Sequence, residues 1–197
     1  MKIAVATLGN FHANHGSQVK PMLGGRAARA EEKMEEHLFE KIESIEIPEL
    51  KVEICKSILE SLPEWFGIPE SNQEYCDGVK DKPFFCVKMN NEIIGFVSLK
   101  HNNKYTLEIY VMGIKREFHN KGIGRKLIKE IAKNAKKEKY EYLEVKTLDE
   151  SRESPEYKKT RLFYSSVGFL PIDVLLNEWG NDNPCLIMLM KIKSDEF

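Results

Sequence analysis

The stretch "REFHNKGIGRKLIKEI", residues 116–131, places Gly122 and Gly124 among basic residues where a helical pattern begins. Apolar residues recur every three or four positions from Ile123 onward and lysines occupy the other face, as in an amphipathic helix. The first amides of a helix lack partners within it and carry the positive end of its dipole. Because glycine has no Cβ atom, a diphosphate can approach these amides closely. The stretch therefore predicts an anion site at the start of a helix.

The stretch does not match two other kinds of phosphate-binding loop, and both mismatches occur at the same residue. Counted from Gly122, the P-loop and the dinucleotide-binding loop both require a glycine at the position that Leu127 occupies. A plain glycine turn between solvated lysines would contain the same residue types. The strands and helices around the turn are therefore needed to choose between these interpretations.

The segments around this turn predict an α+β fold. Asn pairs at 90–91 and 102–103 separate three strand-like runs and suit tight hairpins, because Asn tolerates positive φ. Gly113, near the end of the third run, indicates a bulge or a bend. A strand that follows the helix should lie parallel to the third run. The predicted ranges are strand 40–47, helices 50–62 and 69–81, strands 83–89, 92–101 and 105–114, a helix from 123, strand 140–147, helix 155–168, and strands 169–179 and 184–193.

The composition predicts one domain with an appendage. The chain has 197 residues with 42% hydrophobic content, enough to bury one core. Residues 1–30 contain no acid, and "EEKMEE" follows directly. We therefore expect an N-terminal extension over residues 1–38 and a single domain over residues 39–197. The extension is interpreted as either a leader or an addition made for expression.

Charge and cysteine content argue against several classes of partner. The net charge is −1, and the excess of basic residues is local: residues 114–126 contain five Lys and Arg against the single acid Glu117, so no nucleic-acid partner is expected. No apolar run approaches the ~18 residues of a membrane span, so no membrane partner is expected. The four cysteines lie far apart without a Cys-x-x-Cys pair. This spacing predicts a reducing compartment, taken as the cytoplasm, and no metal site.

Two motifs resemble those of the GNAT family of N-acetyltransferases. "FHNKGIGRKLI" resembles motif A, [QR]-x-x-G-x-[GA] after a strand, although His119 stands where Gln or Arg is usual. "RLFYSSVGF" resembles motif B, F-Y-x-x-x-G-F. With the strand order, the resemblance covers residues 40–193, about four-fifths of the chain. It implies a central mixed, mostly antiparallel sheet of about six or seven strands flanked by about four helices.

The resemblance also implies acetyl-CoA as the cosubstrate, held where the fourth strand separates from the fifth. Its pantetheine arm would pair with the backbone of Met112, Gly113 and Ile114. Its diphosphate would rest on the glycine turn and the start of the helix. The residues expected there are His119, Asn120, Lys121, Gly122, Ile123, Gly124 and Arg125. The side chains of Lys121 and Arg125 either add charge to this site or are solvated bases.

Two residues are expected to move protons. Tyr164 aligns with the motif B tyrosine that protonates the departing thiolate, and a phenol with an ordinary pKa of about 10 is a suitable donor. Glu108 stands eleven residues before His119, an offset similar to that of the catalytic glutamate in the histone-modifying branch.

Strand alternation places Glu108 on the face of Tyr110 and Met112, where it is either the general base or a solvated outward residue. Asp149 and Glu150 are the reserve candidates for the base.

The acceptor is expected to be a small-molecule or peptide amine. Four aromatic residues lie in loops or near element ends, where family members build the acceptor pocket, although an ordinary hydrophobic cluster would look the same. They are Trp65, Phe66, Tyr75 and Trp179. The implied reaction is direct attack of the amine on acetyl-CoA in a ternary complex. A non-catalytic acyl-CoA-binding sensor or scaffold is the alternative, and the resemblance allows a homodimer.

Overall fold

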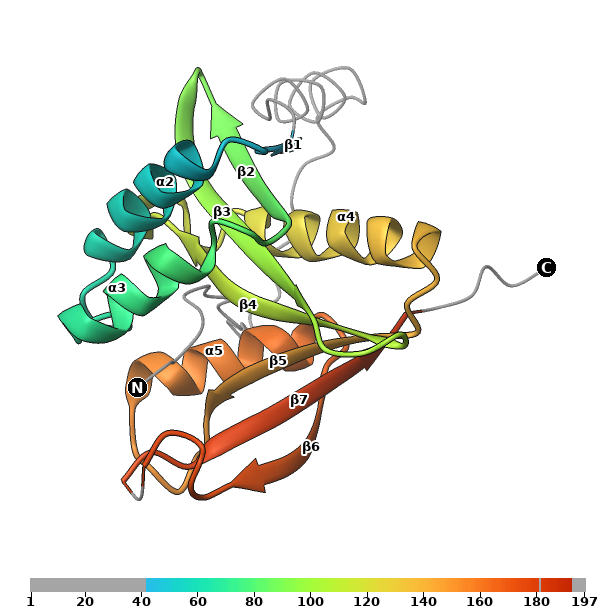
Figure 1. Cartoon of the computed structure of the whole chain (residues 1–197). Helices are drawn as coiled ribbons and strands as arrows, with labels where there is room; N and C mark the ends of the chain where they lie inside the picture. The colour runs from blue at the N-terminus through green and yellow to red at the C-terminus, as the bar shows by residue number, and fades with distance from the viewer. Residues whose placement is uncertain (1–41, 181, 193–197) are drawn as a thin grey trace, which may run out of the picture.

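The computed structural model describes residues 42–180 and 182–192, which form one sheet with helices on both faces (Figure 1). The strand order is β1-β2-β3-β4-β5-β7-β6. The predicted extension over residues 1–38 lies outside the described residues. The elements are β1 (Ile42–Ser44), α2 (Pro48–Glu60), α3 (Pro69–Gly78), β2 (Phe84–Met89), β3 (Glu92–His101), β4 (Thr106–Ile114), the 3-10 helix η1 (Arg116–Phe118), α4 (Ile123–Lys137), β5 (Tyr142–Leu148), α5 (Pro155–Ser166), β6 (Leu170–Leu175) and β7 (Cys185–Lys191).

The sheet is mixed and mostly antiparallel, as predicted. β1 to β4 pair antiparallel in sequence order, and so do β5, β7 and β6. β4 and β5 are parallel because α4 connects them. The α+β class is confirmed, with seven strands in the sheet and four α-helices among the described residues. The strand predicted over 40–47 ends at Ser44, and its residues 40 and 41 lie outside the described part of the chain.

Asparagines make two of the turns by different means. Asn90 and Asn91 have φ angles of 50° and 65°, the left-handed conformation that a two-residue hairpin turn requires. Asn103 acts through its side chain, because its Oδ1 accepts hydrogen bonds from the backbone N–H groups of Tyr105 and Thr106 at 2.8 and 3.0 Å. Both predicted hairpins are confirmed, but only the first uses positive φ.

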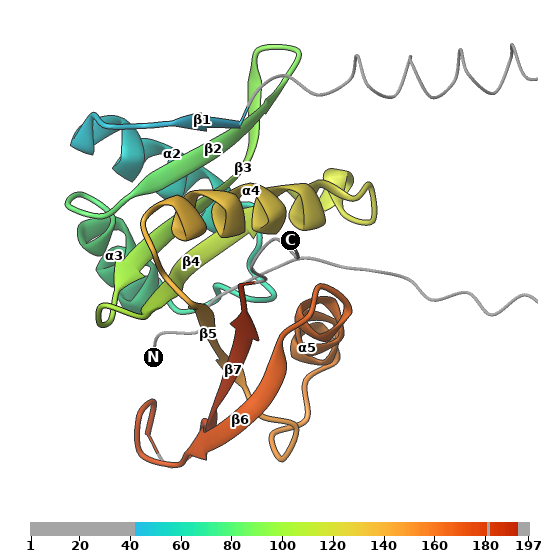
Figure 2. The same ribbon diagram turned by 90° about the vertical axis from the view of Figure 1, so that its right-hand side faces the viewer.

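Two hydrophobic cores lie on opposite faces of the sheet (Figure 2). The α4/α5 core packs the apolar stripe of α4, which includes Leu127 and Ile131, together with Phe163 and Tyr164 of α5. The α2/α3 core packs Ile58 of α2 with residues of α3 and of the loop between these helices. Each large apolar side chain buried in this way contributes about 1.5–3 kcal/mol to the free energy of unfolding.

β4 carries a β-bulge at Tyr110. Ser98 of β3 pairs with Val111, and the next residue, Leu99, pairs with Ile109, so Tyr110 has no partner on β3. A bulge of this kind inserts one residue and shifts the alternation of side chains beyond it.

The bulge decides which side chains of β4 share a face. Ile109 belongs to the α4/α5 core before the bulge, and Met112 does so after it, whereas Val111 belongs to the α2/α3 core. Glu108 and Tyr110 line a hollow with residues of α3. The prediction that Glu108 and Met112 share a face is therefore wrong, because strict alternation holds only along an unbroken strand.

Gly113 serves helix packing and is not the site of the bulge. A Cβ atom at this position would lie 2.7 Å from Cγ2 of Ile58. Glycine therefore lets α2 approach the end of β4 closely. The prediction of an irregularity at Gly113 is wrong in its position.

Candidate active site

β4 and β5 separate after four paired positions. Thr106–Ile109 pair with Tyr142–Val145, and no pairing between these strands continues beyond Ile109, as Figure 1 shows. The rest of β5 pairs only with β7. The later part of β4, which contains Met112, Gly113 and Ile114, therefore presents backbone groups that a ligand can bind in place of a neighbouring strand.

The glycine turn at the end of η1 leaves backbone amides of α4 without partners. Asn120 and Gly122 have φ angles of 62° and 77°, and a Cβ atom on Gly122 would meet nothing within 4 Å. α4 begins at Ile123 with no side-chain cap and no acid in its first turn. The amides of this turn therefore point into open space next to the positive end of the helix dipole, which suits a diphosphate.

The ring of His119 is bound to the protein instead of facing a phosphate. Its Nε2 lies 2.6 Å from the carbonyl oxygen of Ile114, and the indole of Trp65 packs edge-on against it at 5.8 Å. Burial lowers the pKa of His119, so the neutral imidazole donates its Nε2–H to this carbonyl. His119 therefore ties the glycine turn to the end of β4.

The two basic side chains of the turn also have contacts within the protein. Arg125 donates hydrogen bonds to the carbonyl oxygen and to Oγ of Ser166 at 3.0 and 3.2 Å, which joins the start of α4 to the end of α5. Nζ of Lys121 lies 5.1 Å from the centre of the Phe118 ring. The backbone amides therefore remain the main donors for an anion at this turn.

Tyr164 is fully buried in the α4/α5 core. Its ring packs against those of Phe163 and Phe169, with centroids 5.2 and 5.1 Å away. Burial raises the pKa of Tyr164 well above its ordinary value, so the phenol keeps its proton. Its hydroxyl has no hydrogen-bond partner among the described residues, and neither does Oγ1 of buried Thr147 on β5. Orphaned hydroxyls of this kind are rare in cores, and a ligand between β4 and β5 would satisfy them.

A hollow of about 490 Å³ lies on the α2/α3 side of the sheet. Glu108 lines it with a side chain that is 7% exposed, and Lys100 holds its carboxylate at 3.0 Å. Lys146 of β5, also in the lining, pairs with Glu178 at 2.7 Å. Two of the four predicted aromatic residues, Tyr75 and Trp179, line the same hollow.

Comparisons with known proteins agree with this geometry. The model of the Acetyltransferase (GNAT) family matches residues 51–169. The chain belongs to this family. It is an acyltransferase whose cosubstrate is acetyl-CoA, and the resemblance noted in its motifs is confirmed. Comparison with curated proteins gives no significant match.

Solved structures of GNAT acetyltransferases share the fold. A GNAT-family protein from Desulfovibrio desulfuricans aligns with a TM-score of 0.67 at 17% identity, over 78% of this chain and 99% of its own. A GNAT acetyltransferase from Elizabethkingia anophelis with acetyl-CoA bound is 26% identical and aligns with a TM-score of 0.51, over 60% of this chain and 82% of its own. An aminoglycoside 6'-N-acetyltransferase complexed with coenzyme A aligns with a TM-score of 0.63 at 16% identity, over 80% of this chain and 100% of its own.

Trp65 and Phe66 are core residues of this GNAT domain and do not line the hollow of Glu108. Trp65 is 4% exposed and Phe66 is 5% exposed. The indole N–H of Trp65 donates to Oγ1 of Thr160 at 3.2 Å, and the hydroxyl of Tyr157 donates to the carbonyl oxygen of Trp65 at 2.9 Å. Their loop packs against α5, and both residues line a separate hollow of about 240 Å³ together with Tyr75. Contact of Trp65 and Phe66 with the acceptor therefore stays a prediction.

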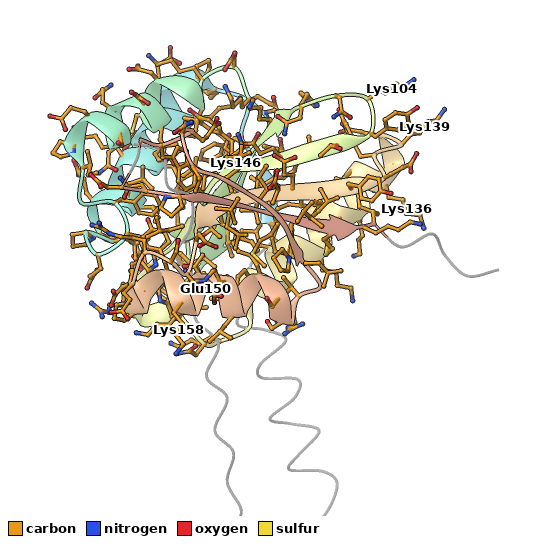
Figure 3. The ribbon with its side chains drawn as sticks, turned by 90° about the horizontal axis from the view of Figure 1, so that it is seen from below. Lys104, Lys136, Lys139, Lys146, Glu150 and Lys158 are labelled. Carbon is orange, nitrogen blue, oxygen red and sulfur yellow. The ribbon has the colours of Figure 1, made fainter. Side chains whose placement is uncertain are left out.

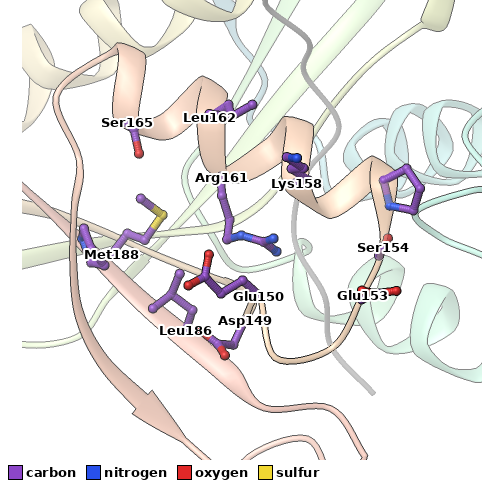
Figure 4. A pocket seen from close by; sticks show the side chains of 12 residues that line it. Asp149, Glu150, Glu153, Ser154, Lys158, Arg161, Leu162, Ser165, Leu186 and Met188 are labelled. Atoms are coloured by element: carbon purple, nitrogen blue, oxygen red, sulfur yellow. The ribbon is translucent and has the colours of Figure 1, made fainter.

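The reserve bases Asp149 and Glu150 line a different hollow, of about 740 Å³, beside α5 and β7. Arg161 extends from α5 into this hollow (Figure 4), and its Nη1 donates a hydrogen bond to the carbonyl oxygen of Leu148 at 2.8 Å. In the view from below, Lys146 lies toward α2 and α3, whereas Glu150 lies beside α5 (Figure 3). The two reserve residues are therefore separated from Glu108 by the sheet.

Sequence reasoning missed the lysine and carboxylate neighbours of Glu108. Glu144 and Lys146 alternate with apolar residues along β5, a period-two signal that could have placed them on the polar face. Lys100 left no such signal, because its contact depends on the register of β3 against β4.

The described residues contain no group of three or more His, Cys, Asp and Glu side chains arranged to hold a metal ion. Within the same residues, no helix is long and apolar enough to cross a membrane.

Proposed function

We propose that this GNAT enzyme transfers the acetyl group of acetyl-CoA to an amine by direct attack within a ternary complex. The observation that carries the proposal is the ion-paired, buried carboxylate of Glu108 in a hollow on one side of the diverging strands. The orphaned hydroxyl of Tyr164 lies in the core on the other side. A proton acceptor and a proton donor are thus available on opposite sides of the place where the thioester would lie.

Acetyl-CoA would be held mainly by backbone groups. The unpaired part of β4 supports pairing of the pantetheine arm with Met112, Gly113 and Ile114, and the open amides from Asn120 to Arg125 support binding of the diphosphate. When bound, the cosubstrate supplies an activated acetyl thioester. Of the side chains in the turn, Lys121 is the one best placed to add charge at the surface.

Glu108 would remove a proton from the incoming ammonium group, directly or through water. The neutral amine then attacks the carbonyl carbon of the thioester, and backbone amides of β4 stabilise the resulting oxyanion. As the C–S bond breaks, Tyr164 would donate its phenolic proton to the leaving thiolate. Proton transfer from positioned groups of this kind typically contributes about 10²–10⁴-fold to a rate.

The acceptor would be a small molecule or the end of a peptide that fits the hollow of Glu108. The lining carries four carboxylates and three lysines, and this small excess of negative charge favours a cationic amine. The carboxylates are those of Glu74, Asp77, Glu108 and Glu178, and the lysines are Lys82, Lys100 and Lys146. One of the structurally similar proteins is an aminoglycoside 6'-N-acetyltransferase, which acts on a small molecule. Four buried, unpaired thiols in this chain support a reducing compartment such as the cytoplasm.

A non-catalytic acyl-CoA sensor is the rival function. The paired carboxylate and the protonated phenol both favour the enzyme, because a sensor needs neither. Release of free thiol from acetyl-CoA in the presence of an amine panel tests the two functions. Binding of acetyl-CoA without thiol release for any amine would favour the sensor.

The glycine turn is tested by Gly124→Glu. A carboxylate beside the open amides should repel the diphosphate and weaken acetyl-CoA binding by more than about 100-fold, because it also occupies the space that the ligand needs. Lys129→Glu, on the exposed face of α4, changes charge in the same direction and should weaken binding far less. Calorimetry measures both, and parent-like affinity in Gly124→Glu would show that the diphosphate binds elsewhere.

A further inference from the structure

Glu108 stands in a row of charged residues that crosses three strands. In the strand register, Lys100 of β3 is paired with Glu108 of β4, and Glu108 is paired with Glu144 of β5. Residues paired across adjoining strands project from the same face of the sheet. The carboxylate of Glu108 therefore has a cation on one side and a second carboxylate on the other.

The contact with Lys100 stabilises the charged form of Glu108. Nζ of Lys100 lies 3.0 Å from Oε2 of Glu108, and the side chain of Glu108 is 7% exposed while that of Lys100 is 43% exposed. A buried carboxylate is stable only with a partner. An opposite charge at this distance favours the ionised state, although the exposure of Lys100 reduces the effect.

Glu144 acts on the same carboxylate with the opposite sign. Its Oε1 accepts a hydrogen bond from Nδ2 of Asn102 at 3.2 Å. Burial raises the pKa of Glu144, and the charge of Glu108 raises it further. Since the interaction between two charges is mutual, the same repulsion acts on the carboxylate of Glu108.

The other groups around Glu108 are two tyrosines and a thiol that burial keeps neutral, and charged side chains that are not paired with it in the strand register. Burial raises the pKa values of Tyr110 and Cys185 to about 12 and that of Tyr75 well above its ordinary value. Lys146 pairs with Glu178 at 2.7 Å. Burial lowers the pKa of Lys146, but Glu178 and the charge of Glu108 raise it overall. The charged groups that complete the lining on the side of α3 are Glu74, Asp77 and Lys82. Lys100 and Glu144 are the two charged residues in register with Glu108.

We propose that Lys100 and Glu144 are positioning residues that set, in opposite directions, the pH at which Glu108 accepts the proton of the acceptor. The proposal rests on the role of Glu108 as the base in the proposed function. Lys100 keeps the carboxylate ionised and oriented, and Glu144 keeps it a strong enough base to be useful. The row thus tunes one carboxylate from two neighbouring strands.

The test uses the full chain with Lys100→Met and Glu144→Gln. Two quantities are measured: the acidic limb of the pH–rate profile, and the titration midpoint of the Glu108 carboxyl carbon by ¹³C NMR, assigned by its loss in Glu108→Gln. Lys100→Met should move both to higher pH by about one unit, and Glu144→Gln should move both to lower pH by about half a unit. Lys100→Arg should keep the values of the parent.

Lys88→Met is the matched control, because it removes another cross-strand ion pair, with Glu43 at 2.6 Å on β1 and β2, and should shift neither quantity. Unchanged midpoints in Lys100→Met and Glu144→Gln, or shifts in the same direction, would overturn the proposal. A loss of melting temperature alone would indicate a merely structural row.

The NMR titration requires no acceptor, so the two proposals can fail separately. Opposite shifts in a protein that acetylates no amine would contradict the proposed function and leave the charge setting in place. Normal turnover with unchanged midpoints would contradict the charge setting alone.

Discussion

The two faces of the sheet differ where β4 and β5 separate. On the α4/α5 face the polar side chains are the neutral hydroxyls of Tyr164 and, by alternation along β5, Thr147; both lack a partner within the described part of the chain. On the α2/α3 face they are charged and paired, Glu108 with Lys100 and Lys146 with Glu178. One face therefore offers protonated donors, and the other offers fixed charge.

This difference matches the two halves of the proposed reaction. A thiolate leaves with negative charge and needs a proton, which a buried phenol retains because burial raises its pKa. An amine arrives as a cation and must lose a proton, which requires a carboxylate that stays ionised in a partly buried place. Each chemical step thus has a face whose electrostatics suit it.

Tyr164→Phe should give the largest effect and disturb the α4/α5 face alone. The rate constant kcat should fall by about 10²–10⁴, the usual contribution of a positioned proton donor, with little change in acetyl-CoA affinity. The melting temperature should not fall, because the deleted hydroxyl has no partner to lose. Steady-state kinetics, calorimetry and thermal unfolding measure the three quantities.

Tyr157→Phe is the control for this loss of a hydroxyl. It removes a group that donates to the carbonyl oxygen of Trp65 at 2.9 Å, so it should lower the free energy of unfolding by about 1 kcal/mol and leave kcat close to the parent value. A parent-like kcat in Tyr164→Phe would show that the proton donor is not the hydroxyl of Tyr164 on the α4/α5 face.

Glu108→Gln tests the charged face. It should lower kcat by about 10²-fold near neutral pH and flatten the acidic limb of the pH–rate profile. The loss should shrink at high pH, where more of the amine is already neutral. Asp149→Asn, across the sheet, should keep the profile of the parent. If Glu108→Gln retains the acidic limb, the base is another group.

His119→Gln should have the smallest effect and concerns the contact that holds the glycine turn to β4. Burial lowers the pKa of His119 in the folded state, so the unfolded chain binds the proton more readily. The stability due to neutral His119 is therefore present above the unfolded pKa of about 6.5 and lost as pH falls through the lower folded value. Gln does not titrate and can still donate an N–H to Ile114.

The melting temperatures of the parent and His119→Gln should therefore agree above about pH 7. Below that pH the melting temperature of the variant should fall less than that of the parent. Differential scanning fluorimetry across this range measures the difference. His101→Gln, an exposed position on β3, should follow the parent. Equal acid sensitivity in all three proteins would show that the imidazole is not the titrating group.

Local patterns were sufficient for the order of the elements and for the parts of the site that lie within one turn of the chain. The apolar stripe after Ile123 predicted α4, and the pair Asn90–Asn91 predicted a hairpin, because each depends on the conformations of a few neighbouring residues. The glycine turn was found in the same way, since a positive φ at Gly122 and an uncapped helix start are local properties.

Burial could not be judged from residue type. Trp65 and Phe66 were predicted to contact the acceptor because large aromatic residues in a loop suit a pocket equally well as a core. Their burial depends on α5, which approaches this loop from a distant part of the sequence and supplies Thr160 as a hydrogen-bond partner for Trp65. Tyr75 and Trp179 therefore line the hollow of Glu108, whereas Trp65 and Phe66 line a separate one.

By itself, the sequence determined the elements, because these follow from local periodicity, and the resemblance of its motifs to a family supplied Glu108 and Tyr164 as candidates. Only the tertiary structure decided which side chains meet. One extra residue at Tyr110 reverses the alternation of β4, and the register of β3 and β5 brings Lys100 and Glu144 to Glu108. Register is set by packing across the whole sheet, so residues far apart in the chain decide which side chains lie beside the proposed base.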